Sequence, residues 1–266
     1  MLSTGAFIPV RLDSERLPRK ALSKIAGKTV LEHLIQRVEA VKQIVSKRDI
    51  VICTTTDSSD DDLQELANEV GVSCFRGEKN DLIKRFHDAN QIFNFEEILQ
   101  IDGDDPLVPP EYSELTLEKL CNDAVDVACT KDLMFGLNVK AFTRQALHKV
   151  YDAYQTLDNE TGFGLYFLNE ELCNVEYVEP TKSSHSNSKV RLTLDYPEDL
   201  AVISTVIRSI PSSHPAPFST DAVVGVLEEN ENLHAINWKR QRDYQVRGTE
   251  RRKPFLALIN GQKIEF

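Results

Sequence analysis

The chain has 266 residues, five cysteines and a formal net charge of −11 at pH 7. This negative charge argues against binding to the phosphates of nucleic acids or to an anionic membrane. It contains no apolar run long enough to span a bilayer, and its first residues lack the pattern of a secretory leader. An odd number of cysteines in mostly apolar surroundings favours free thiols, so we expect a cytoplasmic protein with no nucleic-acid or membrane partner.

Short apolar runs alternate with helical patterns through the first half of the chain. Expected strands cover 6–8, 49–54, 72–75 and 98–101. Helices are expected after Thr29, after the capping residues Ser58 and Ser59, and over 81–93. Thr29 and Glu32 have the spacing of a capping box, which marks the start of the first helix. Strands that alternate with helices indicate βαβ units, so we predict an α/β fold with a mostly parallel sheet.

The second half continues this pattern less regularly. Helices are expected over 113–122, 143–157 and 199–210, and strands over 125–129 and 190–194. We expect one domain over 1–266, with a core over 1–210 and a polar, basic extension over 211–266. That extension begins with a Pro/Ser linker, and its run 255–259 is expected to pair as an edge strand. Residues 159–188 are expected to form a small insertion for acceptor or dimer contacts, and His185 is a candidate contact within it.

A basic loop follows the first expected strand. Residues 11–28 contain six basic and two acidic residues, a local balance of +4 within an acidic chain. Arginine forks and a lysine ammonium suit phosphate oxygens, and nucleotides bind outside the carboxyl ends of strands in α/β sheets. A solvated basic loop is the alternative. The position after the first strand favours phosphate binding.

Two acidic segments follow later strands. Asp102, Asp104 and Asp105 come directly after the strand at 98–101, where carboxylates can hold Mg²⁺ together with substrate phosphates. Gly103 permits a close backbone approach or a positive φ, although Asp, Gly and Pro also form plain turns. Asp195 comes after the run 190–194 and precedes the helix, so it is either an N-cap or a second metal ligand that faces Asp104.

These three segments, in this order, resemble the sugar cytidylyltransferase family, which includes CMP-Kdo and CMP-sialic acid synthetases. The basic loop is similar to the family's phosphate loop at Arg11, Ser14, Arg16, Leu17, Pro18 and Lys20. The branch of spore-coat polysaccharide biosynthesis proteins is similar also at 54–57, at 75–77 with Asp81 and Arg85, at 103–106 and at 195–199. The resemblance covers about residues 6–210 and implies a three-layer α/β/α Rossmann-like fold of the nucleotide-diphosphosugar transferase type.

The resemblance also implies an activity and its residues. A cytidylyltransferase transfers CMP from CTP to a sugar acid or related acceptor and releases pyrophosphate. Arg11, Ser14, Arg16 and Lys20 would hold the triphosphate, and Asp104 and Asp195 would bind Mg²⁺. Arg76, Asp81 and Arg85 are further candidates for contacts to the base, ribose or phosphates. The catalytic group would therefore comprise Arg11, Arg16, Lys20 and Asp104, and we expect a homodimer.

The chain departs from the family pattern at two positions of this predicted site. Arg19 occupies a position where the family usually has glycine, and Asp102 one where the Kdo branch has glutamine. A glycosyltransferase of related fold that uses a nucleotide-sugar donor, or a catalytically silent nucleotide-binding protein, remains an alternative. Dinucleotide, P-loop and zinc motifs are absent from the sequence.

Overall fold

The computed structural model describes residues 3–121, 124–211, 213–251 and 254–265. A seven-stranded sheet lies at its centre in the order β5-β4-β1-β6-β8-β7-β9. Its strands are β1 (Thr4–Pro9), β4 (Ile50–Thr55), β5 (Ser73–Gly77), β6 (Glu97–Gln100), β7 (Val127–Thr130), β8 (Lys140–Thr143) and β9 (Val175–Val178). Neighbouring strands are parallel except where β8 pairs antiparallel with β6 and β7. The expected α/β class with a mostly parallel sheet is confirmed.

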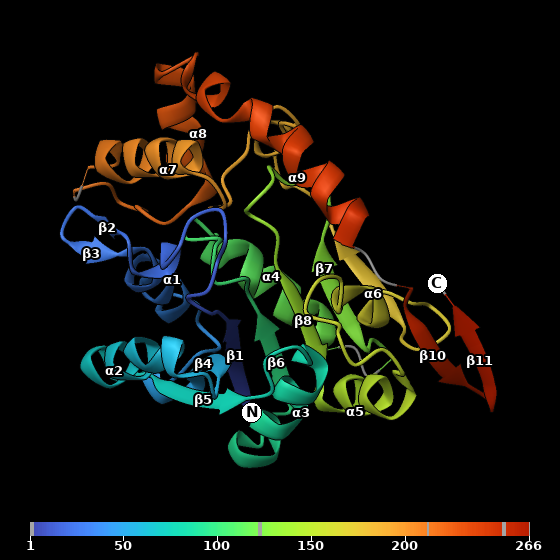
Figure 1. Cartoon of the computed structure of the whole chain (residues 1–266). Helices are drawn as coiled ribbons and strands as arrows, with labels where there is room; N and C mark the ends of the chain where they lie inside the picture. The colour runs from blue at the N-terminus through green and yellow to red at the C-terminus, as the bar shows by residue number, and fades with distance from the viewer. Residues whose placement is uncertain (1–2, 122–123, 212, 252–253, 266) are drawn as a thin grey trace.

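Helices cover both faces of this sheet (Figure 1). They are α1 (Val30–Glu39), α2 (Asp61–Val70), α3 (Leu82–Phe93), α4 (Pro110–Leu120), α5 (Arg144–Ala153), α6 (Gly164–Phe167), α7 (Pro197–Ser209), α8 (Thr220–Glu229) and α9 (Trp238–Arg251). Two short antiparallel pairs complete the fold, β2 (Lys24–Ile25) with β3 (Lys28–Thr29), and β10 (Leu256–Ile259) with β11 (Gln262–Glu265). The result is the predicted three-layer α/β/α arrangement.

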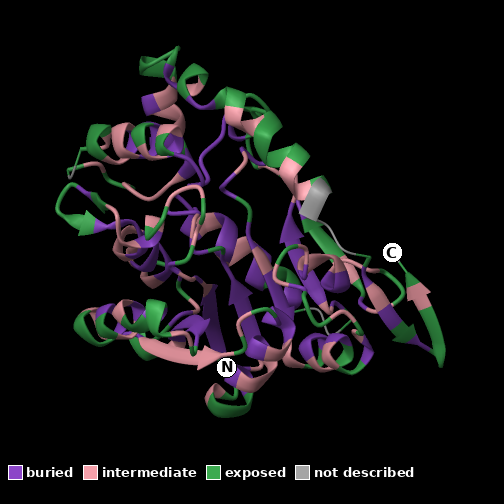
Figure 2. Ribbon diagram, viewed as in Figure 1, coloured by how far each residue is buried: buried purple, intermediate pink, exposed green. Residues whose placement is uncertain are grey.

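Alternation along each strand divides the apolar core in two. In β1, Ala6 and Ile8 face a cluster that includes residues of α1, α2, α4, α7 and α8, whereas Phe7 faces a cluster built with α3, α5 and α6. Successive side chains of a strand point to opposite faces, so a strand buried on both faces becomes a continuous apolar run. The sheet is accordingly buried, and exposed residues concentrate on the outer sides of the helices (Figure 2).

Several local predictions are wrong, each for a structural reason. The run 190–194 is not a strand, because among the described residues it forms no ladder with another strand and is limited to an isolated bridge between Phe135 and Arg191. Ser58 and Ser59 belong to a short 3₁₀ turn capped by Asp57, and α2 begins only after Asp60. The run 255–259 pairs with 262–265 as a hairpin instead of joining the edge of the main sheet.

The region expected as an insertion is partly built into the sheet. Residues 159–188 contain the short helix α6 and the edge strand β9, which pairs parallel with β7 from Val127 to Thr130. The C-terminal extension holds helices α8 and α9, which the sequence analysis did not anticipate. None of the described helices combines the length and the apolar character that a membrane span requires.

Candidate active site

The basic loop between β1 and α1 is held in a defined shape. The backbone N–H of buried Leu12 donates to Asp60 Oδ1 at 2.8 Å, and its carbonyl accepts from the N–H of Arg19 at 3.1 Å. Asp60 is buried and also accepts from the Thr55 hydroxyl at 2.5 Å. The loop is thereby fixed to the end of β4. The sequence analysis missed Asp60, which stands in a run of acidic residues that resembles a solvated surface.

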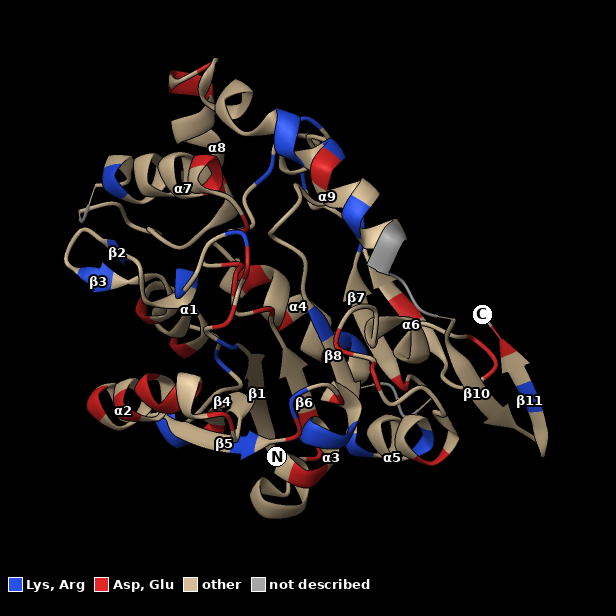
Figure 3. Cartoon of the chain, viewed as in Figure 1, with Lys and Arg blue, Asp and Glu red and all other residues tan. Residues whose placement is uncertain are grey.

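Lys20 joins the three segments that the sequence singled out. Its Nζ donates to Asp104 Oδ2 at 2.6 Å and to Asp195 Oδ1 at 3.0 Å. Arg16 forms a further ion pair with Asp195. Burial acts to lower the pKa of Lys20, but the two carboxylates outweigh it and raise that pKa, so the ammonium stays charged. Acidic and basic segments meet at this point between α1, α4 and α7 (Figure 3).

The close packing of two loops brings Asp104 to Lys20. A Cβ on Gly103 would lie 2.7 Å from Val10 Cβ and 2.8 Å from the Pro9 carbonyl oxygen, so a side chain cannot fit here. The N–H of Gly103 also donates to that oxygen at 3.1 Å. Of the two roles expected for Gly103, the structure supports the close backbone approach.

Asp102 and Asp105, which flank Gly103 and Asp104 in the sequence, have different surroundings. Asp102 is exposed and accepts a hydrogen bond from Gln100 Nε2 at 2.9 Å. Asp105 is buried, and within the described part of the chain its Oδ1 has no hydrogen-bond partner. Burial and the nearby Asp104 and Asp102 carboxylates raise the pKa of Asp105 well above its usual range. The loop after β6 therefore concentrates three carboxyl groups, of which that of Asp104 contacts Lys20.

Asp195 is held by a buried arginine. Arg191 is fully buried and donates to Asp195 Oδ2 at 2.8 Å and to Asp199 Oδ1 at 3.0 Å. Asp199 Oδ2 in turn accepts from the N–H groups of Asp195 and Tyr196, both at 2.9 Å. Tyr196 is the N-cap of α7, so Asp195 is not the cap and its carboxylate is available for Lys20 and Arg16. Although burial opposes them, these cations lower the pKa of Asp195.

The helix α9 lies against this arginine. Gln241 Oε1 accepts from Arg191 at 2.9 Å, and the Tyr244 ring lies 5.0 Å from the Arg191 guanidinium. Burial and the Asp195 and Asp104 carboxylates raise the pKa of Tyr244 to about 12. Arg247 reaches from the same helix to Glu15 in the basic loop. No motif in the sequence marked this contribution from the C-terminal extension.

Arg16, Lys20, Asp104 and Asp195 form one group of ion pairs, the Lys20 cluster. Arg11 and Ser14 lie on the same loop but outside this cluster. Arg11 pairs with Glu160 at 2.5 Å and with Asp13 at 3.1 Å. Burial raises the pKa of Glu160 although Arg11 and Arg85 oppose it. Ser14 makes no hydrogen bond through its side chain to any described residue. Arg11 is thus engaged by carboxylates, whereas the Ser14 hydroxyl has no such partner.

Arg76, Asp81 and Arg85 shape the segment after β5. Arg76 donates to the carbonyls of Thr55 and Asp57 at 2.9 and 2.8 Å. Asp81 caps α3 at the Lys84 N–H at 2.9 Å and accepts from the hydroxyl of Tyr154, also at 2.9 Å.

Arg85 is buried and donates to the carbonyls of Glu78 and Lys79, both at 2.7 Å. The side chains of Arg76, Asp81 and Arg85 therefore bind groups of the protein itself, and they hold the backbone of this segment in place. None of their hydrogen bonds or ion pairs involves Lys20, Asp104 or Asp195.

The structure accounts for the unusual Arg19. Its φ of +57° lies in the left-handed region, where glycine is favoured because it has no Cβ. Its side chain is half exposed and pairs with Asp62 of α2. The guanidinium therefore makes no contact with the Lys20 cluster. The departure from glycine affects instead the backbone conformation at this position.

His185 is a buried structural residue. Its Nδ1 lies 2.7 Å from the Tyr112 hydroxyl and its Nε2 lies 2.9 Å from Asp221 Oδ1. These partners belong to α4 and α8, and His185 lines a groove of about 450 Å³ between them. None of the residues predicted to bind the triphosphate, the nucleoside or Mg²⁺ lines that groove.

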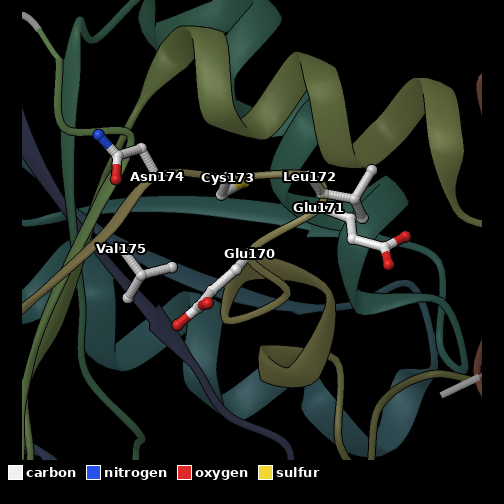
Figure 4. A pocket seen from close by; sticks show the side chains of 6 residues that line it. All are labelled: Glu170, Glu171, Leu172, Cys173, Asn174 and Val175. Atoms are coloured by element: carbon white, nitrogen blue, oxygen red, sulfur yellow. The ribbon is translucent and has the colours of Figure 1, made fainter.

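A second hollow, of about 540 Å³, lies before β9. It is lined by Glu170, Glu171, Leu172, Cys173, Asn174 and Val175 (Figure 4). None of the predicted site residues lines it either. The candidate site is therefore defined by its charged side chains at the edge of the sheet.

The fold and the charge arrangement define a class of protein. A basic loop after the first strand, with two carboxylates on a shared lysine at the same edge, suits a substrate made of phosphates and a cation. That arrangement is typical of a nucleotide-dependent transferase of the α/β class.

Comparison with known proteins specifies the family. The cytidylyltransferase family model matches residues 6–245. A solved cytidylyltransferase from Leptospira borgpetersenii is 26% identical, with a TM-score of 0.79 over 88% of this chain and 97% of its own. The spore coat polysaccharide biosynthesis protein SpsF of Bacillus subtilis is 25% identical over 75% of this chain and 84% of its own length. A 3-deoxy-manno-octulosonate cytidylyltransferase of Glaesserella parasuis is 27% identical over 62% of this chain and 61% of its own length.

The chain belongs to the cytidylyltransferase family, which makes it a CTP-dependent nucleotidyltransferase. The family match extends to residue 245 and so includes most of α9. The resemblance expected from the three sequence segments is thereby confirmed, and it reaches further along the chain than the predicted residues 6–210.

Proposed function

We propose that this protein transfers CMP from CTP to a small sugar acid or a related acceptor and releases pyrophosphate, as a step in the synthesis of a surface polysaccharide or glycoconjugate. The observation that supports the proposal most strongly is the convergence of Arg16, Lys20, Asp104 and Asp195. The spore-coat and octulosonate relatives support an acceptor of the sugar type.

The cations of the basic loop are assigned to the triphosphate. Lys20 and Arg16 lie together at the edge of the sheet, and Arg11 and Ser14 lie on the same loop. In the reaction, an acceptor hydroxyl oxygen attacks the α-phosphorus while the bond from this phosphorus to the bridging oxygen breaks. The hydroxyl proton passes to solvent water, and pyrophosphate leaves with the bridging oxygen. Lysine and arginine stabilise the negative charge that develops on the phosphate oxygens.

Asp104 and Asp195 are the proposed ligands of Mg²⁺. Their oxygens lie within 3.0 Å of one nitrogen, so both carboxylates can reach a single cation. Two carboxylates together with substrate phosphates form the set of ligands that Mg²⁺ prefers, and the Asp104 side chain is 28% exposed. When bound, Mg²⁺ would neutralise phosphate charge and orient the triphosphate. Arg191 and Asp199 would keep Asp195 in place for this role.

The segment after β5 is assigned to the nucleoside. Arg76, Asp81 and Arg85 hold its backbone through hydrogen bonds to carbonyl and N–H groups. A fixed backbone presents donors and acceptors in a constant pattern, which a cytosine edge or a ribose can match. Arg76, Asp81 and Arg85 would therefore contribute to nucleotide binding mainly by positioning this backbone.

A pyrophosphate-release assay tests this function. CTP and Mg²⁺ are supplied with Kdo, sialic, legionaminic and pseudaminic acids, with sugar phosphates and with phosphonates. We expect release with at least one acceptor and its loss in Asp104→Asn. The matched control Asp88→Asn, on the surface of α3, should keep full activity. Wild-type activity in Asp104→Asn, or consumption of a nucleotide sugar in place of CTP, would contradict the proposal.

A further inference from the structure

The hairpin of β10 and β11 forms a separate two-stranded sheet at the side of the molecule, with β11 as its outer strand (Figure 1). Its base is fixed to the body of the protein. The N–H of Leu256 donates to the Thr156 hydroxyl at 3.1 Å, and its carbonyl accepts from the Gln155 N–H at 2.8 Å. The hairpin lies beyond the family match, which ends at residue 245, so the family assigns it no function.

The outer edge of β11 has backbone groups that face away from β10. In an antiparallel pair, residues alternate between positions that exchange hydrogen bonds with the opposite residue and positions that do not. Leu256 directs its N–H and carbonyl to the segment before it, so it exchanges none with its register partner Glu265. The backbone groups of Glu265 therefore point outward, and those of Lys263, two residues earlier, do so as well.

The turn of the hairpin indicates the same alternation. Asn260 and Gly261 have φ of +51° and +78°, as in a two-residue type I′ turn. Ile259 and Gln262 flank this turn, and they are the pair that exchanges hydrogen bonds across it. The next residue, Lys263, is therefore the first in β11 whose backbone groups face outward. Among the described residues, no strand pairs with this edge.

The side chains of Lys263 and Glu265 lie on the outer face of the hairpin. They share this face with their register partners Leu258 and Leu256, whereas Ile264 faces the apolar cluster beneath. Both charged residues are exposed, and neither forms an ion pair with another described residue (Figure 2). The Leu258 residue is 47% exposed. The edge thus presents a cation and an anion, two residues apart, beside an exposed leucine.

This edge is complementary to itself in one register. A two-fold axis pairs two identical strands antiparallel, and the residue on the axis determines which residues face each other. With Ile264 on the axis, Lys263 of each copy lies opposite Glu265 of the other, and each such pair exchanges both of its backbone hydrogen bonds. An axis at Lys263 or at Glu265 would place like charges opposite each other, which is destabilising. An axis between two residues would set outward backbone groups against inward ones.

We propose that the outer edge of β11 pairs with the same edge of a second copy of this chain, in the antiparallel register centred on Ile264. The two hairpins then form one continuous sheet, in which opposite charges face each other across the new boundary. Strands of four residues make a smaller contact than the about 800 Å² per partner of a standard interface, so the dimer dissociates on dilution. This surface differs from residues 159–188, which the sequence analysis considered for dimer contacts.

The alternative is that Lys263 and Glu265 prevent the edge from pairing. Charged side chains on an edge strand commonly protect it against association. A protective role predicts a monomer, and it makes the arrangement of the two charges irrelevant. Self-pairing predicts a dimer that depends on which sign stands at which position. The two roles therefore differ in what a charge reversal and a charge exchange do to association.

Sedimentation equilibrium between about 1 and about 100 μM protein measures the association. We expect the wild-type protein to form dimers in this range. Lys263→Glu and Glu265→Lys each turn both attractive pairs into repulsive ones, so each should raise the Kd of the dimer by about 10-fold or more. Lys24→Glu, at an exposed position of β2, changes the net charge by the same amount as Lys263→Glu and should dimerise as wild type.

Two rescue experiments assign the effect to this register. The double variant Lys263→Glu/Glu265→Lys again places opposite charges face to face, so its dimer should recover. A mixture of the two single variants should form a heterodimer more tightly than either variant associates with itself. A general loss of folding in the single variants would give neither rescue.

Cysteine cross-linking locates the two-fold axis. In a Cys121→Ser background, which removes an exposed thiol, Ile264→Cys places two thiols at a directly opposite pair that exchanges no hydrogen bonds. The Cα atoms of such a pair lie about 4.5 Å apart, which a disulfide can span. Treatment with diamide should therefore give a disulfide-linked dimer of Ile264→Cys. Lys263→Cys in the same background is the matched control, because its two copies are out of register, and it should cross-link much less.

Several outcomes would overturn the proposal. They are a wild-type protein that remains monomeric at about 100 μM, a dimer that Lys263→Glu does not weaken, and a double variant that fails to recover. Cross-linking of Lys263→Cys as efficient as that of Ile264→Cys would contradict the register. Neither CTP nor an acceptor is present in these measurements, so the proposed function stands or fails separately.

Discussion

At the scale of single residues, the site depends on paired charges. Lys20 is buried and yet stays protonated because Asp104 and Asp195 both face it. Asp195 stays ionised for the complementary reason, since Lys20, Arg16 and Arg191 surround it. Removal of any one of these groups leaves a buried charge without its partner, which costs more than the pair itself contributes.

Arg19 gives a prediction about the backbone at this scale. A non-glycine residue with a φ of +57° is strained, whereas glycine accepts this conformation but is more flexible when unfolded. We therefore expect Arg19→Gly to change the free energy of unfolding by less than about 1 kcal/mol. Arg19→Val, with a branched side chain, should lower it by about 1–2 kcal/mol.

Urea denaturation measures both changes, and the KM for CTP provides the functional readout. Because the Arg19 guanidinium pairs with Asp62, that KM should stay at the wild-type value in Arg19→Gly. A large increase in this KM would show that Arg19 contacts the triphosphate after all.

At the scale of elements, the C-terminal helix α9 is part of the site's support. Gln241 and Tyr244 contact Arg191, and Phe135 and Tyr196 contribute two further rings around its guanidinium, at 5.3 and 5.7 Å. Arg191 thus transmits the position of α9 to Asp195. The extension after the Pro/Ser linker therefore contacts the residues that hold Asp195, and the family match continues through it to residue 245.

Arg191→Lys tests this connection. A lysine keeps the charge but cannot bond Asp195, Asp199 and Gln241 together, because it lacks the planar fork of arginine. We expect a loss of about 3 kcal/mol in the free energy of unfolding and a raised Mg²⁺ requirement. Arg208→Lys, on the exposed side of α7, should leave both unchanged. Wild-type stability and Mg²⁺ dependence in Arg191→Lys would contradict the connection.

Local signals predicted some elements well and missed others. The capping box at Thr29 and Glu32 is present as expected, because it depends only on residues three positions apart. The strand β8 was missed, since its four residues obtain their sheet partners only from β6 and β7. Likewise the run 190–194 alternates like a strand, but among the described residues it forms an isolated bridge at Arg191 and no ladder.

The residues of the candidate site were likewise predicted in part and missed in part. Arg16, Lys20, Asp104 and Asp195 belong to recognisable segments, and the structure brings them together. Asp60 and Gln241 were not identifiable, because their contacts depend on partners distant in sequence. A buried aspartate in an acidic run and a glutamine in a polar helix look like ordinary surface residues until the fold places them.

At the scale of the whole molecule, the sheet separates two apolar clusters, and the partly exposed side chains of Arg16 and Asp104 lie at its charged edge. The net charge of −11 opposes the approach of polyanions, whereas the basic loop attracts a small anion locally. The fold therefore suits a free nucleoside triphosphate better than a nucleic acid. Among such nucleotides, we expect the protein to select CTP.

The most direct test is the thermal midpoint of the protein with Mg²⁺ and each of CTP, ATP, GTP and UTP. A nucleotide at about 100 times its Kd stabilises the folded state by about 2.7 kcal/mol. We predict that CTP raises the midpoint more than the other three nucleotides do. In Lys20→Ala, CTP should not raise the midpoint above that of the nucleotide-free variant. Equal shifts with all four nucleotides, or a full CTP shift in Lys20→Ala, would contradict this prediction.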